Sequence, residues 1–154
     1  MAGGSGSRLS PLTKGVSKQL LPIYNKPLIY YPLSTLMLAG IREFLFVVTE
    51  DNLANFQRLF GNGENLGINI DFIVQDKPDG IAKGILLAEN FLKDSKFALI
   101  LGDNFFYGPG LGRSLSKFLE IDGAQIFTYP VSNPSDYGIA EIDVDSRLIS
   151  IEEK

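Results

Sequence analysis

The stretch Ala2-Gly3-Gly4-Ser5-Gly6-Ser7-Arg8-Leu9, followed by Ser17-Lys18-Gln19-Leu20-Leu21-Pro22, is the part of the sequence around which the rest is organised. Three glycines in four positions leave backbone N–H groups unshielded, so the loop can surround a polyphosphate closely. Arg8 and Lys18 add cations within reach of such a ligand. A glycine cluster alone is equally compatible with a flexible start of the chain.

Two standard phosphate-binding motifs do not fit this loop. A P-loop ends in Gly-Lys-Ser/Thr, and that tripeptide does not occur in the chain. A dinucleotide fingerprint needs a third glycine where Leu9 stands and an acid about 20 residues later, whereas the first acid is Glu43. The sequence therefore predicts a phosphate cradle of another type.

The composition is that of an ordinary globular chain. With 154 residues, 45% apolar and 21% charged, we expect a single domain over residues 1–154. The net charge of −4 argues against a nucleic-acid partner. No apolar run approaches the roughly 18 residues that span a membrane, so we expect no membrane partner. The absence of cysteine and of a signal-peptide pattern favours the cytoplasm.

The chain also lacks histidine, the commonest general base and transition-metal ligand. Its chemistry would therefore use carboxylates, cations, backbone amides and a hard ion such as Mg²⁺. A reaction whose nucleophile is already ionised suits this set of groups. A phosphate monoester that attacks another phosphate is one such nucleophile.

Hydrophobic periodicity predicts alternating strands and helices over the first 130 residues. Strands are expected at 44–48, 68–74, 97–101 and 124–131, and helices at 29–39, 52–60, 81–92 and 111–119. A hairpin is expected over 138–151, turning near Asp145-Ser146. This order is typical of a doubly wound, mostly parallel (Rossmann-like) α/β sheet with helices on both faces.

Ligands of doubly wound sheets bind beyond the carboxyl ends of the strands. Asp103 follows the predicted strand 97–101, and could hold Mg²⁺ or simply cap the next segment in an Asx turn. Gln75 ends another strand, with Gly80 nearby, and the pair could recognise a nucleobase edge. A polar residue at a strand end is nevertheless common. Tyr137-Gly138 and Glu153-Lys154 are equally typical of surface turns and solvated charges.

The motifs, taken together, carry a family resemblance. The two opening stretches are followed in order by Ile29-Tyr30-Tyr31-Pro32-Leu33-Ser34-Thr35-Leu36-Met37-Leu38-Ala39-Gly40-Ile41, then Pro78-Asp79-Gly80, then Leu101-Gly102-Asp103-Asn104. This order closely resembles the sugar nucleotidyltransferase family along the whole chain. The run that begins at Tyr30 points to its thymidylyl branch.

The resemblance implies a fold, a reaction and partners. The fold is the nucleotide-diphospho-sugar transferase type. The reaction converts dTTP and glucose 1-phosphate into dTDP-glucose and pyrophosphate, with Mg²⁺ as cofactor. The family's proteins are often homo-oligomers, so we expect a homo-oligomer.

The resemblance also implies residue roles. The expected catalytic residues are Arg8, which would offset charge on the departing pyrophosphate, Lys18, which would bridge the two reacting phosphates, and Asp103, which would hold the metal. The expected nucleotide-binding residues are Ala2, Gly3, Gly4, Gly6, Ser7, Arg8, Gln75, Pro78, Gly80 and Asp103. The expected sugar-phosphate-binding residues are Lys18, Tyr137, Gly138, Glu153 and Lys154.

The sequence departs from the family pattern in ways that leave alternatives open. The family's opening strand and its second half, which carries a second metal-binding aspartate, are absent, so a fragment truncated at both ends is expected. The sheet would then lack a central member, which a partner chain could supply. Two alternatives remain: a nucleotide-binding fragment without catalysis, and a relative that transfers a uridylyl or cytidylyl group.

Overall fold

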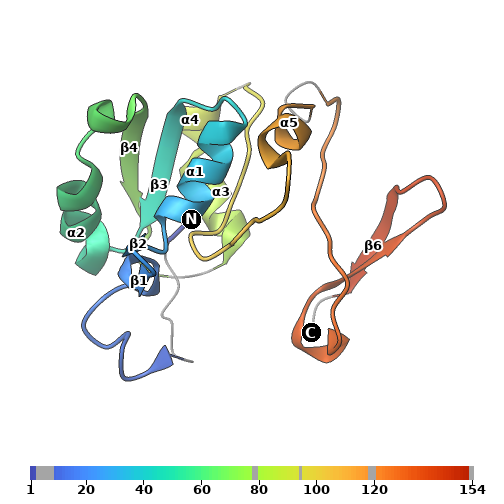
Figure 1. Cartoon of the computed structure of the whole chain (residues 1–154), viewed down its shortest axis with the longest axis horizontal. Coiled ribbons are helices and arrows are strands. Elements are labelled where there is room, and N and C mark those ends of the chain that lie inside the picture. Colours follow the sequence, from blue (N-terminus) through green and yellow to red (C-terminus); the bar gives the residue numbers. More distant parts are fainter. Residues whose placement is uncertain (3–8, 78–79, 94, 118–120, 153–154) are drawn as a thin grey trace. The chain divides into compact units, whose positions relative to one another are not determined.

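The computed structural model describes residues 1–2, 9–77, 80–93, 95–117 and 121–152 (Figure 1). The chain divides into two compact units, Met1–Glu120 and Ile121–Lys154. The expectation of one domain over 1–154 remains a prediction.

A parallel β-α-β element forms the centre of the first unit. Strand β3 (Glu43–Val48) leads into helix α2 (Glu50–Phe60), which returns the chain to strand β4 (Asn69–Val74). The two strands pair in parallel from Glu43↔Asn69 to Val48↔Val74. Glu50 and Asp51 stabilise the amino end of α2 through the helix dipole. Each of these elements was predicted from sequence within a few residues.

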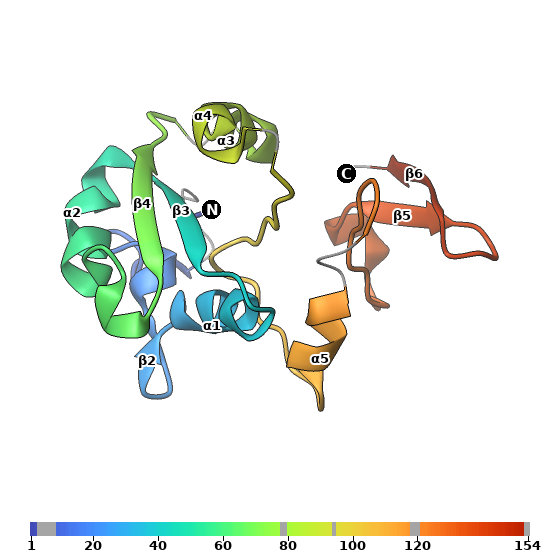
Figure 2. The same cartoon turned by 90° about the horizontal axis from the view of Figure 1, so that it is seen from above.

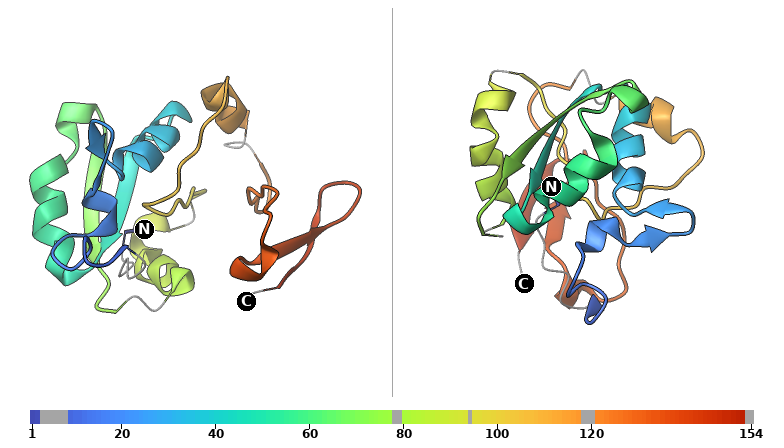
Figure 3. Two further views of the ribbon diagram at one scale, coloured as in Figure 1. Left: turned by 60° about the horizontal axis from the view of Figure 1, so that its bottom comes forward. Right: turned by 90° about the vertical axis from the view of Figure 1, so that its left-hand side faces the viewer.

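Helix α1 (Tyr30–Leu38) packs beside α2, since the rings of Tyr30 and Phe60 lie 5.0 Å apart. Pro32 lies in its first turn, where its missing N–H costs no hydrogen bond. Gly40, with φ +94°, follows the helix and donates to the Met37 carbonyl, as the sequence predicted for its end. Figures 2 and 3 show the strands running between α1 and the pair α3–α4.

The hydrophobic core joins these elements through large side chains. Phe46 of β3 makes edge-on contacts with Phe56 and Phe60 of α2 and with Phe72 of β4. Such aromatic arrangements add stability beyond the area that they bury. The buried cluster consists of Ala2, Ile29, Leu33, Phe44, Phe46, Val48, Phe56, Phe60, Ile68 and Ile70.

Shorter elements complete the first unit. The segment predicted as an opening loop contains the 3₁₀ helix η2 (Lys18–Leu20) and the hairpin strands β1 (Pro22–Ile23) and β2 (Lys26–Pro27). The 3₁₀ helix η3 (Glu64–Leu66) precedes β4. The helix predicted over 81–92 is two helices, α3 (Ile81–Leu87) and α4 (Glu89–Leu92), and α5 is Leu111–Ser116.

Two predicted strands are not strands in the structure. Residues 97–101 and 124–131 have the apolar sequence that is typical of strands. Neither segment pairs with a strand in the described part of the chain. Both predictions were wrong, because a strand is defined by hydrogen bonds to a neighbouring strand and not by apolar sequence alone. In the described part of the chain, the backbone bonds of 97–101 are the one that the Met1 amino group donates to the Ile100 carbonyl and those of the local turn between Leu101 and Asn104.

The second unit contains an antiparallel hairpin. Strand β5 (Ile139–Ile142) pairs with β6 (Leu148–Glu152), and the 3₁₀ helix η5 (Pro134–Asp136) precedes them. The turn includes Ser146 at φ +62°, so the hairpin and its turn are as predicted. None of the described helices has the length and apolar character needed to cross a membrane.

Candidate functional site

An ion pair joins two of the predicted catalytic residues. The Lys18 ammonium donates to the Asp103 carboxylate, with 2.7 Å between Nζ and Oδ2. The two side chains are 33% and 32% exposed, so a ligand can reach both. Two residues far apart in sequence thus present opposite charges at one place. The ammonium could pair with a phosphate, and the carboxylate could bind a cation.

The position of Lys18 follows from the short helix η2. Gln19 is buried and its carbonyl accepts from the Ile29 N–H, while its side-chain oxygen accepts from the Ser17 hydroxyl. These bonds tie η2 to the start of α1. Because Gln19 points inward, the neighbouring Lys18 is directed outward toward Asp103.

Asp103 lies in a turn whose hydrogen bonds do not involve the Asp103 carboxylate. Asn104 accepts the Leu101 N–H on its Oδ1 and donates its N–H to the Leu101 carbonyl. The side chain of Asn104, rather than that of Asp103, therefore closes the turn. The carboxylate of Asp103 stays available to Lys18, which argues against the reading of Asp103 as an Asx-turn residue.

Gly102 allows the close packing behind Asp103. A Cβ at this position would lie 2.8 Å from Gln19 Cγ, 3.0 Å from the Met1 carbonyl oxygen and 3.2 Å from Ile29 Cδ1. The Gly102 N–H also donates to the Met1 carbonyl at 2.6 Å. Only glycine fits without displacing one of these groups.

Gly102→Ala is expected to lower the free energy of unfolding by about 1–3 kcal/mol, the usual cost of overpacking. Urea denaturation followed by circular dichroism measures it. The matched control is Gly108→Ala, because a Cβ there meets nothing within 4 Å. Equal stability of the two variants would contradict the tight packing at Gly102.

Ala2, a predicted nucleotide-binding residue, is buried and its N–H donates to the Val47 carbonyl of β3. The amino group of Met1 donates to the Ile100 carbonyl. Burial lowers the pKa of this amino group below its usual value, and the charge of Asp103 opposes the shift. The start of the glycine-rich stretch is thus anchored beside the ion pair.

Gln75 is the clearest candidate for ligand recognition. It ends β4, its N–H donates to the Val48 carbonyl, and its side chain is only 3% exposed. Its amide nitrogen has no hydrogen-bond partner among the described residues. A buried unpaired donor costs free energy, so such a group usually awaits a ligand or water. This geometry favours the recognition role over an ordinary strand end.

Gly80 lies between the end of β4, where Gln75 stands, and the start of α3. It precedes α3 with φ +93°, a left-handed conformation that favours glycine. On the same helix, a Cβ at Gly84 would lie 3.7 Å from Gln75 Oε1 and would collide with the side chain of Met1. Gly84 therefore lies beside the Gln75 side chain.

An aromatic contact beside the ion pair was not predicted. The ring of Tyr31 lies 4.7 Å from that of Phe105, and Lys26 Nζ lies 4.7 Å from the centre of the Tyr31 ring. The Tyr31 hydroxyl donates to the Ile23 carbonyl. The contact joins residues distant in sequence, so no local pattern could have revealed it.

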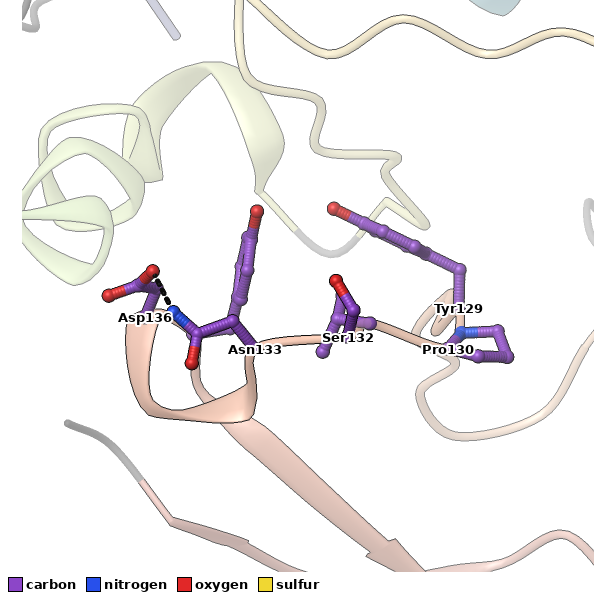
Figure 4. Close-up of a pocket in the computed structure, with 7 residues that line it drawn as sticks. Tyr129, Pro130, Ser132, Asn133 and Asp136 are labelled. Carbon is purple, nitrogen blue, oxygen red and sulfur yellow. Dashed lines mark hydrogen bonds between the residues drawn. The ribbon is translucent and has the colours of Figure 1, made fainter.

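Two predicted sugar-phosphate residues lie in the second unit. Tyr137 lines an open hollow of about 290 Å³, together with Tyr129, Pro130, Val131, Ser132, Asn133 and Asp136 (Figure 4). The Asn133 amide donates to the Asp136 carboxylate at 2.6 Å, a bond within the turn that contains η5. Gly138 leads into β5. Their role in binding a sugar phosphate stays a prediction.

The remaining predicted site residues lie outside the described part of the chain: Gly3, Gly4, Gly6, Ser7, Arg8, Pro78, Glu153 and Lys154. Among the described residues, no cluster of three metal-ligating side chains occurs. A single carboxylate still fits Mg²⁺, because this ion often binds one or two carboxylates together with substrate phosphates. Asp103 is the described residue that suits this arrangement.

Comparisons with known proteins identify the family to which the chain belongs. The nucleotidyl transferase family model matches residues 1–154. A glucose-1-phosphate thymidylyltransferase of Mycobacterium tuberculosis is 52% identical over 154 residues. One from Neisseria meningitidis is 48% identical over 155 residues. Each alignment covers 100% of this chain and 54% of the relative, so the chain spans about half the length of these curated relatives.

Solved structures give the same result. A crystal structure described as a glucose-1-phosphate thymidylyltransferase of Bacillus anthracis, in complex with sucrose, is similar with a TM-score of 0.88 and 32% identity. The match covers 99% of this chain and 61% of that one. An apo UDP-glucose pyrophosphorylase matches with a TM-score of 0.62 and 25% identity, over 76% of this chain and 50% of that one. The predicted α/β fold is confirmed, and the chain belongs to the nucleotidyl transferase family.

Proposed function

We propose that this chain carries the nucleotide-binding part of a glucose-1-phosphate thymidylyltransferase, which converts dTTP and glucose 1-phosphate into dTDP-glucose and pyrophosphate. The observation that carries the proposal is the Lys18–Asp103 ion pair, which presents a cation and a carboxylate to one solvent-accessible place. The names of the relatives support the choice of nucleotide and sugar phosphate.

The proposed chemistry needs positioning and charge neutralisation rather than a general base. The phosphate of glucose 1-phosphate is already anionic and attacks the α-phosphorus of dTTP, and pyrophosphate leaves. Two anions must approach each other, so a cation between them lowers the barrier. Lys18 would supply that cation once its ammonium leaves Asp103 for the phosphates.

Asp103 would hold Mg²⁺ together with the phosphates of the nucleotide. Bound Mg²⁺ would neutralise charge on the transferring and leaving phosphates. Arg8 is proposed to offset charge on the pyrophosphate, with the backbone of residues 3–6 around the phosphates. Gln75, with its unpaired buried amide, is proposed to recognise the thymine edge beside Gly80.

The other roles remain proposals on the resemblance alone. They comprise nucleotide contacts by Ala2, Ser7 and Pro78, and sugar-phosphate contacts by Tyr137, Gly138, Glu153 and Lys154. A cytoplasmic homo-oligomer is proposed on the same ground.

The test is pyrophosphate release from dTTP plus glucose 1-phosphate with Mg²⁺, with nucleotide binding measured by calorimetry on the same sample. We expect binding of dTTP in preference to CTP and UTP, and release only when both substrates are present. A clear preference for UTP would contradict the thymidylyl assignment and favour the uridylyl relative. Absence of both binding and release would contradict the proposal altogether.

A second function, nucleotide binding without transfer, is favoured by one observation. Among the described residues, no group of three metal-ligating side chains surrounds a common position. Binding of dTTP without pyrophosphate release would establish this second function. Turnover would exclude it.

A further inference from the structure

The side chain of Tyr31 joins two parts of the first unit that are distant in sequence. Its hydroxyl donates to the Ile23 carbonyl at 2.7 Å, and the ammonium of Lys26 lies 4.7 Å from the centre of its ring. Both of these residues belong to the hairpin of β1 and β2. On the other side, the Tyr31 ring lies 4.7 Å from that of Phe105, at an interplanar angle of 43°. We call these three contacts the Tyr31 bridge.

At one end of the Tyr31 bridge, the hairpin is bonded to the short helix that carries Lys18. The Leu21 N–H donates to the Lys18 carbonyl, and the Leu28 N–H donates to the Leu21 carbonyl across the base of the hairpin. Figure 2 shows the hairpin, labelled β2, beside the start of α1. Because of these bonds, the backbone of Lys18 moves together with the hairpin that Tyr31 contacts.

At the other end of the Tyr31 bridge, Phe105 lies two residues after Asp103. Before Asp103 in the chain, Gly102 packs closely on the side chain of Gln19. After it, the Phe105 side chain is 54% exposed, and among the described residues Tyr31 is its only aromatic contact. The turn that carries the carboxylate is therefore supported before Asp103 by Gly102 and after it by the Tyr31 bridge.

The ion pair between Lys18 and Asp103 cannot hold these two parts together during the proposed reaction. Lys18 would leave Asp103 for the phosphates, and Asp103 would hold Mg²⁺, so their direct contact ends when the substrates bind. The pair is also one third exposed, and exposed ion pairs are weak. The contacts of Tyr31 use neither of these charges, so they persist when the ion pair separates.

We propose that Tyr31 is a positioning residue, which holds the turn of Asp103 against the segment of Lys18 so that the carboxylate and the ammonium keep their relative position. The catalytic consequence rests on the function proposed above, in which one group binds the metal and the other the phosphates. A displacement of about 1 Å at a reacting centre lowers a rate by about 10². A side chain that touches neither substrate can therefore set the rate.

The first experiment uses the free protein and needs no nucleotide. Nitrogen-15 relaxation of the Lys18 ammonium group measures how firmly it is held, and Asp103→Asn gives the reference for a released ammonium. We expect Tyr31→Leu to raise the mobility of the ammonium close to this reference. The matched control is Tyr107→Leu, which removes the same atoms from a side chain that is 92% exposed and should leave the mobility unchanged. Unchanged mobility in a folded Tyr31→Leu variant would overturn the proposal.

Two further variants separate the ends of the Tyr31 bridge. Tyr31→Phe keeps the ring and loses only the bond to the Ile23 carbonyl, so a smaller rise in Lys18 mobility is expected. Phe105→Leu removes the other end, and should match Tyr31→Leu or replace it as the test if that variant does not fold. Because both changes act through one contact, the double variant should be no more mobile than the more mobile single variant. Additive rises would show independent effects and refute the bridge.

The second experiment measures pyrophosphate release and separates positioning from a general loss of structure. Tyr31→Leu is expected to lower kcat by about 10–10², with little change in the KM for dTTP, because Gln75 is not touched. Tyr107→Leu should keep both constants, and circular dichroism shows whether each variant is folded. A wild-type kcat in folded Tyr31→Leu would refute the proposal. If the unmodified protein releases no pyrophosphate, the proposed function fails, and the mobility of the Lys18 ammonium still decides whether Tyr31 holds the pair.

Discussion

Asp103→Asn is expected to lower the rate of pyrophosphate release by about 10²–10³, the usual effect of losing one charge-stabilising group at a reacting centre. The amide keeps the size of the side chain but cannot neutralise a divalent cation. The same change is expected to remove the Mg²⁺ dependence of dTTP binding measured by calorimetry. The Mg²⁺ dependence of dTTP binding can be measured even if the chain binds the nucleotide but does not transfer it to glucose 1-phosphate.

Folding should hardly respond to this substitution. The Lys18–Asp103 pair is about one third exposed, and such pairs contribute at most about 1 kcal/mol. The matched control is Asp71→Asn, an exposed carboxylate on β4. Metal-dependent binding that persists in Asp103→Asn and resembles that of the control would contradict the metal-binding role.

Phe56→Ala is expected to lower the free energy of unfolding by about 3–5 kcal/mol. The Phe56 side chain is fully buried, with 0% exposure, and its ring lies 6.1 Å from that of Phe46 in an edge-on contact. Removal of the ring leaves a cavity where α2 packs on β3. Small domains have a total stability of about 5–15 kcal/mol, so this loss is a large fraction of it.

Urea denaturation followed by circular dichroism measures the effect on Phe56. Gln57→Ala is the matched control, because Gln57 is exposed on the same helix and should change stability by at most about 0.5 kcal/mol. A loss for Phe56→Ala no larger than that of the control would show that α2 does not anchor the core.

Local sequence patterns predicted the elements that are stabilised by near neighbours. The apolar spacing of α1 and α2, the alternation in β4 and the turn at Asp145-Ser146 all depend on residues a few positions apart. The single helix predicted over 81–92 was wrong in one respect, because the chain breaks it at Ala88. The 3₁₀ helix η2 and the hairpin of β1 and β2 were read as loop because each is only two or three residues long.

The strand predicted at 97–101 failed for a different reason. Its apolar sequence is correct for a buried strand, but pairing depends on what lies beside it in space. Among the described residues, its only backbone bond to a segment distant in sequence is the one that Met1 donates to the Ile100 carbonyl. Pairing is a property of two segments, so a pattern within one segment cannot decide it.

In the candidate site, too, the sequence predicted individual residues but not the contacts between residues that are distant in sequence. Lys18 and Asp103 were identified as chemical candidates from their motifs, but their 2.7 Å contact could not be read from residues so far apart in sequence. Gln75 was identified by its place at a strand end, whereas its burial and unpaired amide required the structure. The contact between Tyr31 and Phe105 was not predicted from the sequence.

The ring of Tyr31 has a spectroscopic consequence. It contacts Phe105, two residues after Asp103, while its hydroxyl bonds the hairpin at Ile23. Any displacement of the loop behind Asp103 changes the surroundings of this phenol. The chain contains no tryptophan, so tyrosine emission is not masked by energy transfer to an indole. Tyr31 is one of six tyrosines in the chain, so its contribution is the part of the tyrosine emission that a Tyr31→Phe variant removes.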